Sequence, residues 1–258
     1  LKTLCGFSVT EIAKAFVTGY DTIEKRLTRA RQSFRDNNVQ FELPPAAELE
    51  NRLDNVLLAI YLLFNEGYNS TQHEDLIRKD LMHEAMQLCE LICRSRAVDH
   101  CKAHALMALI CFTESRNEAR QDAAGNILLL KEQDRKRWNK ALIEKGIFHL
   151  EASSEAEQVN KYQLEAGIAY EHARAASYAS TNWRNILKCY DLMCQFYPSP
   201  IIELNRAIVI SEINGPAEGI KAIEAITNLS ALKKYYLLPA TLGELNWQLQ
   251  NNKLANQY

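Results

Sequence analysis

Apolar residues recur at spacings of three and four along almost the whole chain, and this period limits the fold more than any other feature. Only 9 glycines and 6 prolines interrupt the pattern in 258 residues, and 47% of the residues are hydrophobic. Each amphipathic helix has to bury its apolar stripe against another element, so a succession of them predicts an all-α protein with a sizeable core. The length permits one or two domains.

Two short helices are predicted at the N-terminal end. Ser8 and Glu11 match a capping box, which predicts a helix of about eight residues beginning at Val9. The following "VTG" predicts a break, where Gly19 is expected to adopt a backbone conformation that other residues avoid. A second helix is expected from about Tyr20. Two helices joined by so short a turn match the outline of a helix-turn-helix.

The second of these helices combines an apolar stripe with a basic surface. Ile23, Leu27, Ala30 and Phe34 follow one another at spacings of four, three and four. Residues 1–35 hold seven bases against three acids, giving +4, whereas the rest of the chain carries −6. Such an asymmetry suggests a basic module that meets a polyanion. A solvated helix surface would explain the charges as well, but the helix-turn-helix outline favours DNA.

The predicted DNA contacts lie on this basic helix. Its N-terminal half would enter the major groove, so Thr22, Lys25 and Arg26 are the candidates to reach base edges or adjacent phosphates. Arg29 and Arg31 lie further along and are expected to hold phosphates, which supply affinity and salt dependence.

Consecutive prolines at Pro44 and Pro45 mark a boundary, because they stop a helix and stiffen a linker. We therefore expect a helix-turn-helix domain at residues 1–43 and a helical extension at residues 44–258. Within the extension, residues 52–68 are apolar nearly all round and are predicted to form a central, buried helix. Further helices are expected at 81–92, 100–112, 132–151, 163–176 and 183–196.

Two features interrupt or repeat this helical pattern. Gly125 and Asn126 precede a short aliphatic run, which predicts a tight turn or a small hairpin. From Pro198 onward, a helix, a break at "NGP" and a second helix are followed by another apolar helix, a polar break and a last helix. Helix pairs of this kind are typical of tetratricopeptide-like stacking, which we expect over about residues 182–258.

The cysteines and the apolar runs bear on location. Seven cysteines are scattered through the chain, several of them inside apolar helical runs, which is typical of reduced thiols in a cytoplasm. The longest apolar run has nine residues, whereas a membrane-spanning helix needs about 20. A cytoplasmic protein with no membrane partner is expected.

Neither metal binding nor catalysis is predicted. The histidines and cysteines that lie close together in sequence lack CxxC or HExxH spacing, and the cysteines occupy apolar positions. They are interpreted as core thiols and solvent-facing histidines, with no bound metal ion and no cofactor. The absence of a glycine-rich phosphate loop and of GxSxG argues against an enzyme. The residues considered are His83, Cys89, Cys93, His100, Cys101 and His104.

Polar side chains are concentrated in "LKEQDRKRWN", residues 130–139. Salt bridges along a helix explain most of this composition, with Asp134 and Trp138 on a shared helix face. A sharper hypothesis is a buried polar network with "FNEGYN", residues 64–69, which either packs the two segments together or lines a small pocket. The packing role is favoured. The candidate residues are Asn65, Glu66, Gln133, Asp134, Arg135 and Trp138.

The N-terminal segments "CGFSVTEIAKAF" and "DTIEKRLTRARQSF" resemble region four of bacterial extracytoplasmic-function (ECF) sigma factors, the RNA polymerase subunits that choose promoters. The "EIA" behind Ser8 and the "RLTRAR" that contains Arg26 and Arg29 are the matching parts. Further on, "AIYLLFNEGYN", "LLLKEQDRKRWN" and "YPSPIIELNRAIVISEINGPAEGI" resemble the long helical extension of one ECF subgroup. Val17 departs from the pattern, because many of these turns have glycine there.

This resemblance implies promoter recognition by the helix-turn-helix while the protein is bound to core RNA polymerase. It implies that region two, which melts the promoter and grips the polymerase, precedes Leu1 in the whole protein, so that the chain is a fragment. It further implies that the extension regulates sigma activity, with a YCII-related protein as a candidate partner. The role of Glu24 stays open, since it could repel a phosphate or accept a hydrogen bond from cytosine.

Two other functions remain as alternatives. One is a conventional helix-turn-helix regulator with a ligand-sensing helical domain. The other is a tetratricopeptide-type scaffold whose basic helix contacts only proteins. Promoter sequence, inducing signal and oligomeric state are not predicted.

Overall fold

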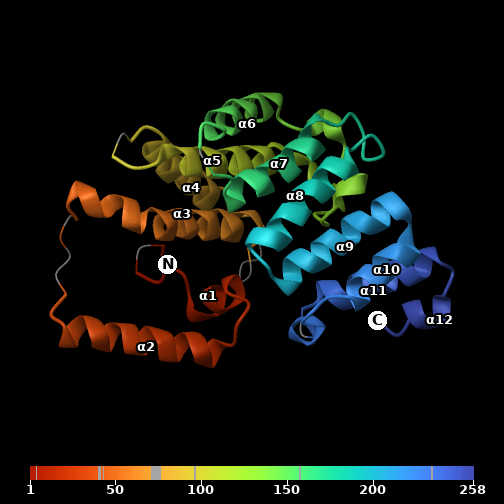
Figure 1. The fold of residues 1–258 in the computed structure, drawn as a ribbon, viewed down its shortest axis with the longest axis horizontal. Helices are drawn as coiled ribbons and strands as arrows, with labels where there is room; N and C mark the ends of the chain where they lie inside the picture. The colour runs from red at the N-terminus through yellow and green to blue at the C-terminus, as the bar shows by residue number, and fades with distance from the viewer. Residues whose placement is uncertain are drawn as a thin grey trace.

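The computed structural model describes residues 1–3, 5–39, 42, 44–70, 77–95, 97–156, 158–233 and 235–258, with the side chains at 46 and 47 left out. These residues form an all-α array, as predicted (Figure 1). Its α-helices are α1 Val9–Ala15, α2 Tyr20–Asp36, α3 Ala46–Tyr68, α4 Lys79–Cys93, α5 His100–Ser115, α6 Lys140–Ser153, α7 Lys161–Arg174, α8 Trp183–Phe196, α9 Pro200–Asn214, α10 Pro216–Glu224, α11 Leu237–Gln248 and α12 Asn252–Ala255.

Helix α5 is the central element, with α4, α6 and α7 packed around it. Small residues at Ala103, Ala105 and Ala108 allow its neighbours to come close, and all three are fully buried. On the α6 side, a Cβ added to Gly146 would lie 2.6 Å from the ring of Phe112, so a larger residue at this crossing would displace that buried ring. The prediction that residues 52–68 form a central, buried helix is therefore correct only in part. Helix α3 forms, but its Val56 is 45% exposed.

Side-chain caps explain where several helices begin. Asp99, Asn139, Asn160 and Asn182 each accept a hydrogen bond from a backbone N–H in the first turn of α5, α6, α7 and α8, respectively. Such caps satisfy donors that the helix itself leaves unpaired. Between α9 and α10, Gly215 has φ 92°, a left-handed conformation that glycine adopts without strain, and Pro216 starts the next helix.

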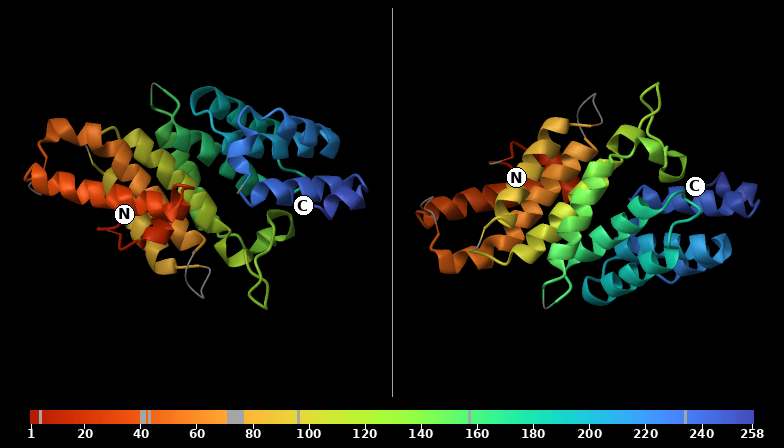
Figure 2. Two further views of the ribbon diagram at one scale, coloured as in Figure 1. Left: turned by 90° about the horizontal axis from the view of Figure 1, so that it is seen from below. Right: turned by 90° about the horizontal axis from the view of Figure 1, so that it is seen from above.

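The helices after α7 continue the array away from α5. Contacts run from α7 to α8, from α8 to α9, from α9 to α10 and from α10 to α11, so each helix packs on the one before it. Figure 2 shows these blue and cyan helices as a stack beside the α3–α7 part. The stack has a separate core, which contains Leu204, Ala207, Ile223 and Leu245.

Helices α1 and α2 join the α5-centred core through α1. The predicted capping box is present, because Ser8 Oγ accepts from the Glu11 N–H and the Glu11 carboxylate accepts from the Ser8 N–H. Ile12 and Ile23 belong to one cluster with Leu57 of α3. The apolar stripe of α2 is covered only at its start, since Ile23 is 3% exposed and Phe34 is 51% exposed.

The turn between α1 and α2 differs from the expectation. Gly19 has φ −76°, an ordinary value, and it is Val17 that adopts the left-handed conformation, with φ 48°. A β-branched residue is strained there, because its Cβ crowds the backbone. Val17 is the residue at which the sequence departs from the region-four pattern, and its backbone conformation is the one in this turn that favours glycine.

The segment before α6 is not the continuous helix predicted for residues 132–151. Two short 3-10 turns, Leu130–Glu132 and Arg135–Arg137, precede α6, which begins only at Lys140. The predicted turn around Gly125 is confirmed. It is closed by an isolated bridge between Gln121 and Ile127. Among the helices that the structure describes, none is long and apolar enough to cross a membrane.

Val17 gives a direct test of the turn geometry. Replacing it with glycine should raise the free energy of unfolding by about 1 kcal/mol, because the left-handed strain disappears and this exposed side chain contributes little packing. Denaturant unfolding of the whole chain measures the change. The control is Thr18→Gly. Thr18 lies outside the left-handed region, so glycine relieves no strain there and should lower the free energy of unfolding. Equal destabilisation by both variants would contradict the strained turn.

Candidate functional sites

The basic surface of α2 is exposed along its length. Thr22, Lys25, Arg26 and Arg29 all lie on the solvent side of this helix. None of the ion pairs that the described residues form involves Lys25, Arg26 or Arg29. At about 100° per residue, these four side chains fall within an arc of roughly 100°. They form one surface, which we call the basic face.

Arg31 is separated from the basic face. Two residues further along a continuous helix, it points roughly 160° away from Arg29, so the two cannot contact the same phosphates. Of the five predicted DNA-contacting residues, four share one surface and Arg31 does not. Glu24 also lies off this face, about 140° from Arg29.

The predicted polar network is divided between two places. Glu66 is buried and accepts a hydrogen bond from Ser70 Oγ, while Asn65 lies beside Tyr61. The end of this segment is held by Arg120, a residue that the sequence did not suggest. Its guanidinium donates to the Tyr68 carbonyl and lies 3.6 Å from the centroid of the Tyr68 ring.

The other candidates of the network lie around the end of α7. Arg135 donates to the backbone carbonyls of His172 and Ala175, and its guanidinium stacks on the ring of Trp138 at 4.7 Å from the centroid. Gln133 donates to the Leu128 carbonyl. Asp134 is exposed and caps the short turn that follows it, since its carboxylate accepts from the Lys136 N–H.

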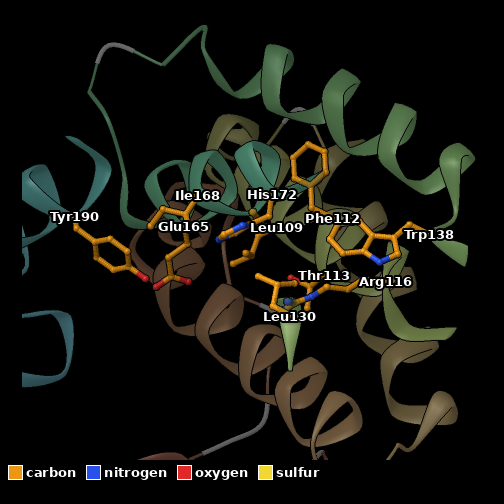
Figure 3. Close-up of a pocket in the computed structure, with 11 residues that line it drawn as sticks. Leu109, Phe112, Thr113, Arg116, Leu130, Trp138, Glu165, Ile168, His172 and Tyr190 are labelled. Atoms are coloured by element: carbon orange, nitrogen blue, oxygen red, sulfur yellow. The ribbon is translucent and has the colours of Figure 1, made fainter. Parts of the chain in front are cut away.

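Trp138 lines a cavity of about 270 Å³ at the C-terminal end of α5, and none of residues 64–69 lines it with Trp138. Figure 3 shows Trp138 and Arg116 at one end of the cavity, with Glu165 and Tyr190 at the other and His172 between them. The walls come from α5, α7, α8 and the segment before α6. Apolar residues fill the gaps between these groups: Leu109, Phe112, Leu130, Ile168 and Ala169.

Burial controls the charges in this cavity. Desolvation, together with the positive charges of Arg116 and Arg135, lowers the pKa of His172 to about 4, so the imidazole is neutral at pH 7. Desolvation also raises the pKa of Glu165, against the opposing effect of Lys161. Trp138 Nε1 and His172 Nδ1 are buried and have no hydrogen-bond partner among the described residues. The cavity therefore offers polar atoms to a small ligand.

A larger hollow of about 520 Å³ opens beside this cavity and shares Leu130, Ile168, His172 and Tyr190 with it. It lies between α7, α8, α9 and α11. Tyr178 donates to Glu212 at 2.9 Å on its wall. The two hollows together follow the junction between the α5-centred part and the later helices.

The interpretation of the histidines and cysteines needs a correction. Cys93 of α4, His104 of α5 and His149 of α6 bring one ligand atom each within 4.8 Å of one another. His149 is 3% exposed and the other two are half-buried, so these are neither solvent-facing histidines nor a plain core thiol. The sequence did not point to His149, because it stands 45 residues from its partner His104.

Comparison with known proteins finds a family model over the middle of the chain and a relative over most of its length. The model of a family described as "Family of unknown function (DUF6596)" matches residues 52–154, from α3 to the end of α6. An uncharacterized protein of Rhizobium meliloti (strain 1021) is 34% identical over 249 residues, which cover 96% of this chain. The chain spans 58% of the length of that relative. No solved structure matches the chain.

The pH dependence of stability tests the cavity. His172 has a folded pKa of about 4, below its unfolded value of about 6.5, so the unfolded chain binds the extra proton first as pH falls. The free energy of unfolding should therefore drop between about pH 6.5 and pH 4, by at most about 1.4 kcal/mol per pH unit from this residue. His172→Gln should show a shallower slope in denaturant titrations across that range. Identical slopes would contradict a buried, neutral His172.

Proposed function

We propose that this chain is the promoter-recognising and regulatory part of an ECF-type sigma factor. The observation that carries the proposal is the basic face: Thr22, Lys25, Arg26 and Arg29 lie exposed on one side of α2, directly after a capped helix and a short turn. Helix-turn-helix proteins place the start of their second helix in the major groove. The resemblance of this segment to sigma region four supports the same role.

In this proposal α1 fixes the reading helix to the rest of the protein. Its residues Ile12 and Ala13 are buried in the cluster that includes α3 and α5, so α2 is presented on a packed base. Thr22, Lys25 and Arg26 contact bases or adjacent phosphates, and Arg29 contacts the backbone further along. In the whole protein, region two would supply promoter melting and the main contact with core RNA polymerase.

The extension would regulate this activity through protein contacts. Stacked helix pairs from α8 onward offer the broad surface that helical repeats use to bind other proteins, and a YCII-related protein is a candidate partner. We also propose that this stack binds partner proteins as tetratricopeptide repeats do, and that the protein is located in the cytoplasm.

A ligand-sensing helix-turn-helix regulator is the second candidate function. It is favoured by the cavity beside α5, where Trp138 Nε1 and His172 Nδ1 lie buried without partners among the described residues. The two functions differ in their need for polymerase. The longer protein should copurify with core RNA polymerase if it is a sigma factor, and failure to do so with DNA binding intact would favour the regulator.

DNA titration at several salt concentrations tests the basic face. Affinity of the chain for promoter DNA should fall as salt rises, because each phosphate contact releases a counterion. Lys25→Ala, Arg26→Ala and Arg29→Ala should each weaken binding, and loss of a phosphate contact should reduce the salt slope by about 1.

Arg31→Ala is the matched control, since it removes the same charge from the same helix but from another side. It should leave both affinity and slope nearly unchanged. An Arg31→Ala defect as large as that of Arg26→Ala would contradict the basic face, and binding that does not depend on salt would contradict DNA recognition altogether.

A further inference from the structure

Three helices bring side chains that can act as metal ligands to one place, where α4 ends and α5 begins. Cys93 closes α4, His104 lies one turn inside α5 and His149 lies in α6. Their closest ligand atoms lie within 4.8 Å of one another. His104 Nδ1 and His149 Nδ1 are 2.8 Å apart. No two of these residues come from the same helix, so the cluster depends on tertiary packing rather than on a helical repeat.

The surroundings suit a bound cation. Two imidazoles in hydrogen-bond contact require one nitrogen to carry a proton and the other a lone pair, and a cation between them replaces that single proton. Nearby, the Glu90 carboxylate pairs with Lys145 at 2.9 Å and with Arg94 at 3.2 Å, so its charge is balanced and the ligand atoms themselves would hold the cation.

The thiol favours a soft or borderline metal. Cys93 is half-buried at the end of α4, and its sulfur lies within 4.8 Å of the ligand nitrogens of His104 and His149. A thiolate, not a thiol, is the form of cysteine that binds metals. One turn earlier in α4, Cys89 is fully buried and donates its thiol proton to the Ala103 carbonyl of α5, which ties the two helices together beside the cluster. One thiolate and two neutral imidazoles form a donor set that prefers zinc and related transition metals over magnesium or calcium.

We propose that Cys93, His104 and His149 bind one Zn²⁺ ion per chain, with a water molecule or an external ligand in the fourth position. Nitrogens bound tetrahedrally at 2.0–2.1 Å lie about 3.3 Å apart, so the two imidazoles need to separate by only about half an ångström. The rings of His100 and Phe148 flank His104 at 5.6 Å and 6.5 Å between centroids. The inference is independent of the proposed DNA-binding role.

Cobalt titration of the whole chain tests the site. Co²⁺ replaces zinc in such sites, and thiolate coordination adds a charge-transfer absorption that free Co²⁺ lacks. The wild-type chain should bind one equivalent and develop this absorption. Cys93→Ser should abolish the absorption, and His104→Gln should weaken Zn²⁺ binding by about 100-fold or more, in competition with a chromophoric chelator.

Matched controls separate the site from other thiols and imidazoles. His83→Gln, on the exposed side of α4, and Cys194→Ser, in α8, should bind as the wild type does. Melting of each metal-free variant checks that it is folded, and His104→Gln is chosen because His104 is less buried than His149. The proposal would be overturned if the wild-type chain bound Zn²⁺ no more tightly than Cys93→Ser and His104→Gln do. It would also be overturned if the control variants lost as much Zn²⁺ affinity as these two variants.

Discussion

The crossing of α5 with α6 is the contact on which most of the structure depends. Phe112 lies against the backbone of Gly146, where a larger residue would displace its ring, and this close approach lets α6 cover the middle of α5. Residues from Ala105 to Phe112 are then almost completely removed from water. Burial of this continuous apolar segment contributes much of the hydrophobic stabilisation in the part of the chain before α8.

The two polar sites lie toward opposite ends of this same helix. The cluster of Cys93, His104 and His149 lies beside its first half, and the cavity with Arg116 and His172 lies at its C-terminal end. A helix that is apolar through its middle can hold polar groups only where neighbouring helices diverge or end. The arrangement places the cavity next to α8, where the later helices begin, so a ligand there would contact both parts of the array.

The regular parts of this fold could be predicted from local sequence, and the sites could be predicted only in part. The apolar period located most helices, and the capping box of Ser8 and Glu11 located the start of α1, because both signals act within neighbouring turns of one helix. The 3-10 turns before α6 were missed, since Asn139 caps the helix later than the charge pattern suggested. In the sequence, the only sign of the strain at Val17 is that many region-four turns have glycine at this position. His149 and Arg120 could not be assigned, because their partners lie far away in sequence and meet them only through packing.

Hydrogen exchange followed by mass spectrometry tests the central position of α5 most directly. If α5 is the helix around which the others pack, its amides from Ala105 to Cys111 should exchange only through global unfolding and be among the slowest in the chain. The exposed second half of α2, from Ala30 onward, should exchange much faster. Exchange of α5 as fast as that half of α2 would contradict the account.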